Sequence, residues 1–329
     1  MPRFWLNKTW WRWFLLPLAF VFYLLSRARY FLYRCGVFKV HQLDVPVVVV
    51  GNISVGGNGK TPLVLFLAQA LVAHGFKVGI LSRGYGGSCR QFPHQVSVSQ
   101  DSASKVGDEP YLMALRNIAP VVIDPKRARG AEYLAKHLQC ELIISDDGLQ
   151  HYALARDYEI VVMDERGVGN GALLPMGPLR ELPSRLKQVN ALVINGNKTP
   201  SVDTSALLTH MQLEAADLRP LNENEQLFDP DIRPITAIAG IGYPQRFFNT
   251  LSSLNISPDQ QRAMPDHHQF SIDDFPTDGT ILMTEKDAVK CRQLALKNAW
   301  YLPVNANLDQ RLLDDILKVL GNLTKHTTT

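Results

Sequence analysis

Residues 47–62 read VVVVGNISVGGNGKTP. Four consecutive valines predict a buried strand of a parallel sheet, and the turn rich in glycine and asparagine that follows them predicts a tight loop. We expect a helix to begin at Lys60 and Thr61, because Pro62 would stand in the first helical turn, where a missing N–H costs nothing. A strand, a glycine-rich loop, Gly-Lys-Thr and a helix in this order indicate a phosphate-binding loop.

Each part of this loop has a predicted role in binding a nucleoside triphosphate. The glycines let backbone N–H groups close around phosphate oxygens, and the helix N-terminus adds its partial positive charge. Lys60 would reach the β- and γ-phosphates, and the Thr61 hydroxyl would ligate Mg²⁺. Ser54 stands where the pattern G-x-x-x-x-G-K-[ST] has its first glycine, and the alternative is a strand-to-helix turn with an incidental lysine. The residues predicted to bind ATP are Ser54, Val55, Gly56, Gly57, Asn58, Gly59, Lys60 and Thr61.

The size and composition of the chain limit its class. At 329 residues it is long enough for two domains of ordinary size. A hydrophobic content of 46% with 20% charged residues is typical of a folded protein, and a net charge of +3 gives no argument for binding nucleic acid. The four cysteines lie far apart without a C-x-x-C pair. This spacing excludes a cysteine-rich zinc site and a disulfide framework, and it favours reduced thiols in the cytosol.

The N-terminal segment combines apolar, aromatic and basic residues. Residues 14–25 form an uncharged apolar run, four tryptophans precede it, and no acidic residue occurs before Asp44. A signal peptide is disfavoured because no small-residue cleavage site follows the run, and a buried core helix would hold an unusual number of tryptophans and cations. We expect a helix at the surface of the inner (cytoplasmic) membrane, with the rest of the chain on the cytoplasmic side. A single span, which needs roughly 20 apolar residues, is the main alternative.

Beyond the loop, predicted strands alternate with predicted helices. Helices are expected after Lys60 and at 109–117 and 124–139, and strands are expected at 76–81, 120–123, 141–147, 159–164 and 191–195. This alternation predicts an α/β fold with a doubly wound parallel sheet covered on both faces. The polar stretch 88–105 is interpreted as a loop or hairpin insertion.

A second, smaller α/β unit is expected in the C-terminal part. Residues 235–239 predict a strand that runs into a glycine-rich turn and a helix. A later strand at 280–283 ends at Thr284-Glu285-Lys286-Asp287, where Thr284 and Asp287 have the spacing of a capping box. The predicted domains are an N-terminal membrane-associated helix (1–38), a phosphate-loop domain (39–185) and a second α/β domain (186–329).

The strand predicted at 141–147 delivers two carboxylates, Asp146 and Asp147, to its C-terminal end. Open parallel sheets place their sites at such strand ends, and in phosphate-loop enzymes an aspartate there orients Mg²⁺ directly or through water. We therefore predict that Thr61, Asp146 and Asp147 serve the metal. A solvated pair of acids is the alternative.

Two further segments are candidates for proton transfer. Asp108 either caps the helix that follows it or accepts a hydroxyl proton as a general base. Asp266-His267-His268 is a metal pair, a proton relay or a plain polar turn. Because adjacent histidines in a strand point to opposite faces, a single acid–base or orienting histidine is favoured over a metal site.

Three arginines, Arg83, Arg127 and Arg180, stand near predicted strand ends or in a loop rich in glycine and proline. Guanidinium groups bind phosphate well, so they are candidates for contacts with phosphate groups. A solvated surface position is the alternative for each of them.

Known classes of phosphate-loop protein can be compared with this sequence. A GTPase should carry an N-K-x-D motif, but residues 197–200 lack the aspartate and residues 284–287 have the wrong spacing. A partition-type ATPase of the K-G-G-x-x-G-K class needs a lysine at the position of Val55. A kinase for a small molecule or a lipid is favoured.

A set of segments, in this order, resembles the tetraacyldisaccharide 4'-kinase family, the P-loop kinases of lipid A biosynthesis. The resemblance covers about residues 10 to 290, a range that includes the N-terminal helix. Ser54, at the position of the first glycine, fits the family's own pattern. The segments are Gly51-Asn52-Ile53-Ser54-Val55-Gly56-Gly57-Asn58-Gly59-Lys60-Thr61-Pro62, Leu81-Ser82-Arg83-Gly84-Tyr85-Gly86, Val106-Gly107-Asp108-Glu109-Pro110, Asp146-Asp147-Gly148-Leu149-Gln150-His151, Gly177-Pro178-Leu179-Arg180-Glu181, Asp266-His267-His268 and Thr284-Glu285-Lys286-Asp287-Ala288-Val289.

The resemblance implies transfer of the γ-phosphoryl group of ATP to the 4'-hydroxyl of a tetraacyldisaccharide 1-phosphate, which gives lipid IVA, a bis-phosphorylated lipid A precursor. It implies two α/β/α units with the glycolipid acceptor between them at the membrane surface, and no obligate protein partner. Asp108 would be the catalytic base, and His267 in preference to His268 would partner it. The residues implied near the acceptor or the phosphates are Arg83, Arg127, His151 and Arg180. The rival interpretations are a P-loop kinase for another lipid or a nucleoside, and a membrane-docked regulatory ATPase.

Overall fold

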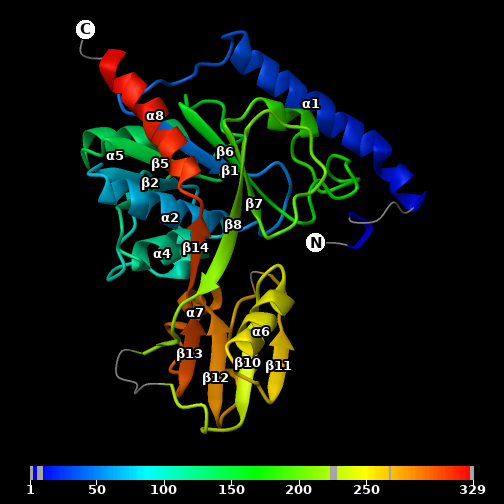
Figure 1. Ribbon diagram of the computed structural model, residues 1–329, viewed down its shortest axis with the longest axis vertical. Helices are drawn as coiled ribbons and strands as arrows, with labels where there is room; N and C mark the ends of the chain where they lie inside the picture. The colour runs from blue at the N-terminus through cyan, green and yellow to red at the C-terminus, as the bar shows by residue number, and fades with distance from the viewer. Residues whose placement is uncertain (1–2, 6–9, 223–227, 267, 327–329) are drawn as a thin grey trace.

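The computed structural model describes residues 3–5, 10–222, 228–266 and 268–326, which fold around two sheets (Figure 1). A nine-stranded sheet forms the upper part of the molecule in Figure 1, and a five-stranded sheet lies below it. Two strands of the larger sheet, β8 and β14, lead the chain down to the smaller sheet and back again.

The larger sheet has the strand order β14-β8-β7-β6-β1-β5-β2-β4-β3. Its central strands run parallel and are buried at every residue. They are β1 (Val47–Gly51), β2 (Val78–Ser82), β4 (Val121–Ile123), β5 (Leu142–Asp146), β6 (Tyr158–Asp164) and β7 (Ala191–Asn195). Because β1 lies between β5 and β6, the loop after β1 starts at the point where the strand order reverses, the usual ligand site of such sheets.

Three outer strands complete this sheet. β8 (Leu207–Ala215) is parallel to β7, β14 (Val304–Leu308) is antiparallel to β8, and β3 (His94–Gln95) is antiparallel to β4. The sheet therefore includes residues on both sides of position 186, so the two sheets divide the chain differently from the predicted domain ranges.

Helices cover both faces of the larger sheet, as the alternation of its valines requires. Val48 and Val50 pack toward α2 (Lys60–Ala73), α4 (Asp108–Leu115) and α8 (Arg311–His326). Val47 and Val49 face the other side and pack toward α5 (Arg127–Lys136). The doubly wound α/β prediction is confirmed. The remaining short elements of this part are α3 (Ala103–Val106) and the 3-10 helix η3 (Pro183–Lys187).

The smaller sheet has the order β11-β10-β12-β13-β9, with its first four strands parallel. Its elements are β9 (Arg219–Pro220), β10 (Ile235–Ala239), α6 (Pro244–Ser253), β11 (Gln260–Ala263), η4 (Ile272–Asp274), β12 (Thr280–Thr284), α7 (Glu285–Cys291) and β13 (Ala299–Leu302). Phe247 and Phe248 of α6 pack on one face, and Ala288 and Cys291 of α7 pack on the other. The predicted second α/β unit is thus present.

The N-terminal segment lies outside both cores. It comprises η1 (Arg3–Trp5), η2 (Trp10–Leu15) and α1 (Leu16–Arg34). The stretch Trp10–Arg34 is long and apolar enough to cross a membrane, and only 6% of its most apolar window is buried. Tyr30 and Tyr33 attach α1 to the rest of the molecule through ring contacts with Tyr152 at 5.3 and 6.0 Å.

Several local predictions differ from the structure. The polar stretch 88–105 contains β3 and α3. The helix predicted from residue 124 begins only at Arg127, because the Asp124 carboxylate accepts the N–H of Lys126 at 2.7 Å and ends the preceding loop. At α7 only half of the predicted capping box forms. The Thr284 hydroxyl accepts the N–H of Asp287, while the Asp287 carboxylate accepts the N–H of Gly240 at 2.8 Å.

Candidate active site

A hydrogen bond between two side chains of the phosphate-binding loop joins its beginning to its end. Gly59, at the N-cap of α2, has a φ of 90°, and a Cβ there would lie 2.3 Å from the amide nitrogen of Asn195, so only glycine fits. The Asn58 side chain donates to the Ser54 hydroxyl at 3.2 Å. The serine at the position of the first glycine therefore ties the two ends of the loop together.

The loop is held from outside by the segment rich in glycine and proline. The N–H of Val55 donates to the carbonyl of Pro178 at 2.9 Å, and the N–H of Arg180 donates to the carbonyl of Ile53 at 2.7 Å. From β7, the Asn195 side chain donates to the carbonyl of Asn58 at 3.0 Å. These bonds fix the loop before any phosphate binds, so its N–H groups need little rearrangement on binding.

Asp146 ends β5 in a buried position at the carboxyl edge of the sheet. Its Oδ2 accepts the Ser82 hydroxyl at 3.3 Å, and its Oδ1 is buried without a hydrogen-bond partner among the residues that the structure describes. Burial, followed by the negative charge of Glu109, raises the pKa of Asp146 well above its usual range.

The neighbouring Asp147 has the opposite electrostatic surroundings. It has a φ of 46°, which turns it out of the strand. Its carboxylate lies 3.5 Å from the Lys60 ammonium and accepts the Arg180 guanidinium at 3.1 Å through both oxygens. Burial opposes ionisation, but Lys60 and Arg180 outweigh it and lower the pKa of Asp147.

This edge fits a magnesium ion. A buried carboxylate oxygen of Asp146 lacks a hydrogen-bond partner, Asp147 is adjacent, and Thr61 stands in the first turn of α2. Within the described residues no three His, Cys, Asp or Glu side chains cluster as a complete metal cage. That arrangement suits Mg²⁺, which takes few protein ligands and fills its shell with water and phosphate oxygens.

Arg127 is buried beneath the two aspartates, at 3% exposure. It donates to the backbone carbonyl of Asp146 at 2.7 Å, and its Nε and Nη1 have no partner among the described residues. Burial lowers the pKa of Arg127 to about 10, although Asp146 and Asp147 act to raise it. The predicted alternative of a solvated surface arginine is therefore wrong for Arg127. Arg83, in contrast, has an exposed side chain.

His151 lies close to these arginines. Burial, followed by the charges of Arg127 and Arg83, lowers its pKa to about 3, so the imidazole is neutral at physiological pH. Arg29 of α1 also lowers this pKa, which places the N-terminal helix within electrostatic reach of the site. A neutral His151 is suited to hydrogen bonding, and it is not a source of positive charge for phosphate.

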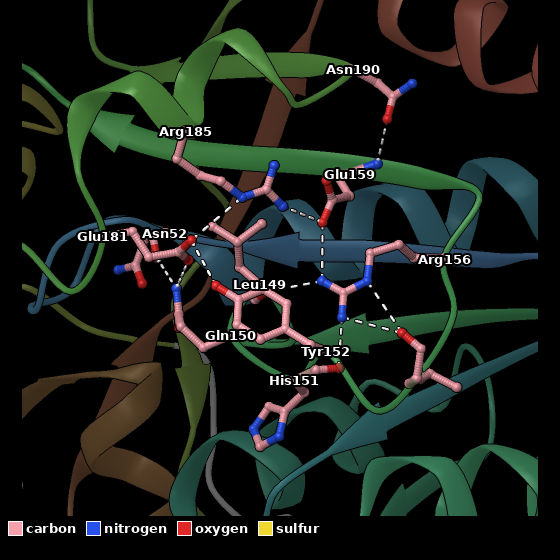
Figure 2. Close-up of polar contacts among 11 residues, drawn as sticks. Asn52, Leu149, Gln150, His151, Tyr152, Arg156, Glu159, Glu181, Arg185 and Asn190 are labelled. Carbon is pink, nitrogen blue, oxygen red and sulfur yellow. Dashed lines mark hydrogen bonds and ion pairs between the residues drawn. The ribbon is translucent and has the colours of Figure 1, made fainter. Parts of the chain in front are cut away.

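The turn that carries His151 rests on a polar network, shown in Figure 2. The Arg156 guanidinium donates to the carbonyls of Leu149 at 2.9 Å and His151 at 2.6 Å, and to Glu159 at 3.0 Å. Figure 2 shows the imidazole of His151 pointing away from this network. Arg156 therefore fixes the backbone of the turn and leaves the ring available to the site.

The same network connects the turn to the phosphate-binding loop. Gln150 donates to the carbonyl of Asn52 at 3.1 Å and to Glu181 at 2.6 Å, and the Tyr152 hydroxyl donates to the other oxygen of Glu181 at 2.9 Å (Figure 2). Because Glu181 directly follows Arg180, this arrangement also holds the backbone next to Arg180, whose guanidinium donates to Asp147.

Asp108 lies in the first turn of α4, and the next residue, Glu109, is within electrostatic reach of Asp146. The N-cap position belongs to Gly107, whose φ of 97° suits glycine, and Asp108 is the first residue of the helix. The structure thus gives no support to the prediction that Asp108 caps the helix. Asp266, in the loop after β11, lies 3.7 Å from Lys286, which is also 3.4 Å from Glu109.

Of the two histidines in the Asp266-His267-His268 segment, His268 belongs to the described residues and His267 lies outside them. The His268 ring is paired with Asp274 at 3.0 Å and packs edge-on against Phe270 at 4.9 Å between ring centroids. The His268 imidazole is thus engaged within the smaller-sheet part.

Comparison with known proteins identifies the family. The sequence matches the family described as LpxK, tetraacyldisaccharide-1-P 4'-kinase, over residues 11–321. The chain belongs to this kinase family.

Relatives of the tetraacyldisaccharide 4'-kinase family match over nearly their whole length. The protein of that name from Aeromonas salmonicida is 47% identical over 328 residues, covering 98% of this chain and 97% of the relative. The one from Pasteurella multocida is 47% identical over 329 residues, covering 98% and 99%. The crystal structure of LpxK from Aquifex aeolicus in complex with ATP aligns with a TM-score of 0.81 at 31% identity, covering 94% of this chain and 99% of that one.

In this tetraacyldisaccharide 4'-kinase family member, a cavity lies between α1 and the site. It is lined from α1 by Tyr23, Arg27 and Tyr30. On the other side it is lined by Tyr152 and Arg180 from the loops after β5 and β6, and by Arg185 from η3. Aromatic rings and guanidinium groups therefore line the space between α1 and Arg180, which contacts Asp147.

Sequence reasoning missed several side chains that build the site. Gln150, Glu181 and Lys286 stand inside segments that carried the family resemblance, but no role was predicted for them. Arg156 and Asn195 had no signal in the sequence, because the backbone carbonyls to which they donate are brought close only by the fold.

Proposed function

We propose that this chain transfers the γ-phosphoryl group of ATP to the 4'-hydroxyl of tetraacyldisaccharide 1-phosphate at the cytoplasmic face of the inner membrane, and that the product is lipid IVA. The observation that carries the proposal is the convergence of the phosphate-binding loop, the carboxylates of β5 and the first turn of α4 at one edge of the sheet, in a chain that belongs to this kinase family.

ATP would be held by the loop residues 54–61. Their N–H groups surround the phosphates, and Lys60 neutralises charge on the β- and γ-phosphates. In the structure Lys60 is paired with Asp147 at 3.5 Å. Phosphate binding would add a second anion beside the same ammonium.

Thr61, Asp146 and Asp147 would hold Mg²⁺ together with phosphate oxygens. When bound, the ion supplies charge neutralisation for the transferring phosphoryl group. The raised pKa of Asp146 means that its carboxylate is costly to ionise without a cation beside it.

The acceptor hydroxyl would attack the γ-phosphorus while the bond from that phosphorus to the β,γ-bridging oxygen breaks, which releases ADP. Asp108 would accept the hydroxyl proton as general base. Its place at the start of α4, beside Glu109 and within electrostatic reach of Lys286, supports this role. His267 is proposed as its partner, and His268 has a weaker claim because its ring is bonded to Asp274.

The glycolipid would approach along α1. The exposed apolar side of α1 contacts the membrane, and Tyr23, Arg27 and Tyr30 of α1, which line the small cavity beside Arg180, would face the sugar and phosphate groups. Arg83, Arg127, His151 and Arg180 would contact the acceptor or the transferred phosphate. The neutral imidazole of His151 would act as a hydrogen-bonding group for a sugar hydroxyl.

The test is to incubate the purified protein with γ-labelled ATP, Mg²⁺ and tetraacyldisaccharide 1-phosphate in detergent. We expect label at the 4'-position of the lipid. Label released as free phosphate at the same rate with and without acceptor, and none in the lipid, would contradict the proposal and favour a regulatory ATPase. Label in other lipids but not in this one would contradict the proposed acceptor.

A further inference from the structure

The two sheets are joined at the site by contacts between α4 and α7. Figure 1 shows α7 at the junction between the two parts of the molecule. One ion pair joins the helices at each end of α4. At the site end, Lys286 of α7 lies 3.4 Å from Glu109, and at the far end Arg116 lies 2.7 Å from Glu285.

The two ion pairs have different surroundings. Arg116 also donates to Asn305 at 3.1 Å and to the carbonyl of Val304 at 3.1 Å, both on β14, so it fastens α7 to the returning strand. Lys286 is placed among acidic groups. Its ammonium lies 3.7 Å from Asp266, and its side chain is only 22% exposed. Although burial opposes its charge, Glu109, Asp266 and Asp108 outweigh this and raise the pKa of Lys286.

The acidic groups around Lys286 belong to both parts of the molecule. Asp108 and Glu109 start α4 on the larger sheet, and Asp266 follows β11 of the smaller sheet. The turn before α6 also approaches the phosphate-binding loop here. A Cβ on Gly242 would lie 3.4 Å from Asp266 and 3.8 Å from the backbone nitrogen of Gly57. The smaller sheet therefore meets the phosphate loop at the place where Lys286 stands.

We propose that Lys286 is a positioning residue for phosphoryl transfer, whose ammonium joins Glu109 to Asp266 and thereby fixes the first turn of α4 against the phosphate-binding loop. It acts through these carboxylates and sets the distance between Asp108 and the γ-phosphate. The inference rests on the proposed role of Asp108 as base.

The physical need for such a cation follows from the charges at the site. Asp108, Glu109 and Asp266 all act on Lys286, and the charge of Glu109 also acts on Asp146. ATP adds further negative charge to the same space. Without Lys286 the two acidic elements would repel each other, and the cleft between base and phosphate would widen. A displacement of about 1 Å is enough to cost roughly a hundredfold in rate.

The experiment compares Lys286→Met with Arg116→Met, which removes the second ion pair between the same two helices. Lys297→Met, at an exposed position after α7, controls for the loss of a lysine. For each variant we would measure kcat, KM for ATP and the dissociation constant for ATP. We expect Lys286→Met to lower kcat by about 10- to 100-fold with ATP affinity within about threefold of the unaltered protein. Arg116→Met and Lys297→Met should change kcat by less than about threefold.

Two more variants keep the proposal testable if Lys286→Met folds poorly. Lys286→Arg, which retains the charge, should recover most of kcat, and Glu109→Gln should lose kcat in the same selective way. In a double variant the two losses should be clearly less than additive, because both act on one contact.

An equal loss of kcat in Arg116→Met would show that the two pairs merely join the helices, and would overturn the proposal. A raised KM for ATP at unchanged kcat in Lys286→Met would also overturn it, since Lys286 would then contact nucleotide. If the unaltered protein fails to phosphorylate the lipid, the proposed function fails first. If it succeeds and both Lys286 variants match it, only this inference fails.

Discussion

Two regions of this protein depart from the usual arrangement of a folded chain in opposite directions. At the carboxyl edge of β5, charged groups are buried, with Asp146 at 2% and Arg127 at 3% exposure. Along α1, large apolar groups are exposed, with Leu18 at 58% and Leu25 at 67%. Buried charges and exposed apolar surface both carry a free-energy cost in water.

The cost of the buried charges is offset within the protein, whereas the cost of the exposed apolar surface is not. The charges at β5 are compensated within the protein, since Lys60 and Arg180 pair with Asp147 and Arg127 lies beneath both aspartates. The apolar surface of α1 has almost no compensation within the chain, because 6% of its most apolar window is buried. The first region is prepared for a small charged ligand, and the second is suited to a lipid surface.

The largest expected effect comes from removing a compensating charge at the phosphate loop. Lys60→Met should lower kcat/KM for ATP by about 10²- to 10³-fold, because Lys60 is proposed to neutralise the transferring phosphoryl group. Steady-state phosphorylation of the glycolipid measures this. Lys77→Met, an exposed lysine before β2, is the control and should be near normal. A Lys60→Met protein with more than a tenth of the normal kcat/KM would exclude this role.

The next effect concerns stability. Arg127→Met leaves the buried Asp146 carboxylate and its neighbour Asp147 with one cation fewer, so the free energy of unfolding should fall by about 3 kcal/mol. Urea unfolding in detergent without nucleotide would measure the loss. Lys136→Met is the control on the same helix: Lys136 pairs with Glu132, and both side chains are more than half exposed, so its loss should lower the free energy of unfolding far less. Equal losses for both variants would contradict the special position of Arg127.

Part of this region could be predicted from the sequence. Four valines before a glycine-rich loop predicted β1 and the start of α2 at Lys60, because strand burial and helix initiation are set by near neighbours. The place of Asp146 and Asp147 at a strand end was also predicted. Their opposite electrostatic surroundings were not, since these result from burial and from charges distant in sequence, Glu109 near Asp146 and both Lys60 and Arg180 near Asp147.

The rest required the fold for similar reasons. The pairing of β14 with β8 returns the chain to the larger sheet across some ninety residues, and no local pattern indicates it. In the sequence, Lys286 stands within a rejected guanine-binding motif, a predicted capping box and a segment of the family resemblance, and none of these predicted a role for its side chain. Its position beside Glu109 results from the packing of α7 on α4, so its proposed role could not be predicted.

A smaller effect separates the two neighbouring aspartates. Because burial raises the pKa of Asp146 to about 7, against about 3.8 in the unfolded chain, the folded state holds an extra proton between these values. The unfolding free energy should therefore decrease as pH rises from about 4 to 7. Asp146→Asn removes this loss and should stabilise the nucleotide-free protein by about 2 kcal/mol at pH 8 and by little at pH 4.

Asp147→Asn is the matched control with the opposite sign. The pKa of Asp147 is lowered, so its carboxylate contributes stability above the unfolded value, and that stability is lost as pH falls through the folded pKa. The variant should be less stable than the unaltered protein at pH 8. Urea unfolding between pH 4 and 8 would measure both. Destabilisation at pH 8 by both substitutions would show that the two carboxylates are held in the same way.

The smallest expected effect tests the exposed apolar region. Leu25→Ser on α1 removes one side chain, 67% exposed, from the surface proposed to enter the membrane, and should weaken binding to vesicles of anionic phospholipid by about fivefold, or ~1 kcal/mol. The free energy of unfolding in detergent should stay within about 0.5 kcal/mol, because Leu25 contributes little to either core. Val72→Ser, on the exposed side of α2 at 40%, is the control and should leave vesicle binding unchanged. Vesicle flotation measures both variants.

If Leu25→Ser remains fully bound even after extraction with alkaline carbonate, α1 spans the bilayer. If both variants bind equally weakly, the apolar surface of α1 is not the part that meets the lipid.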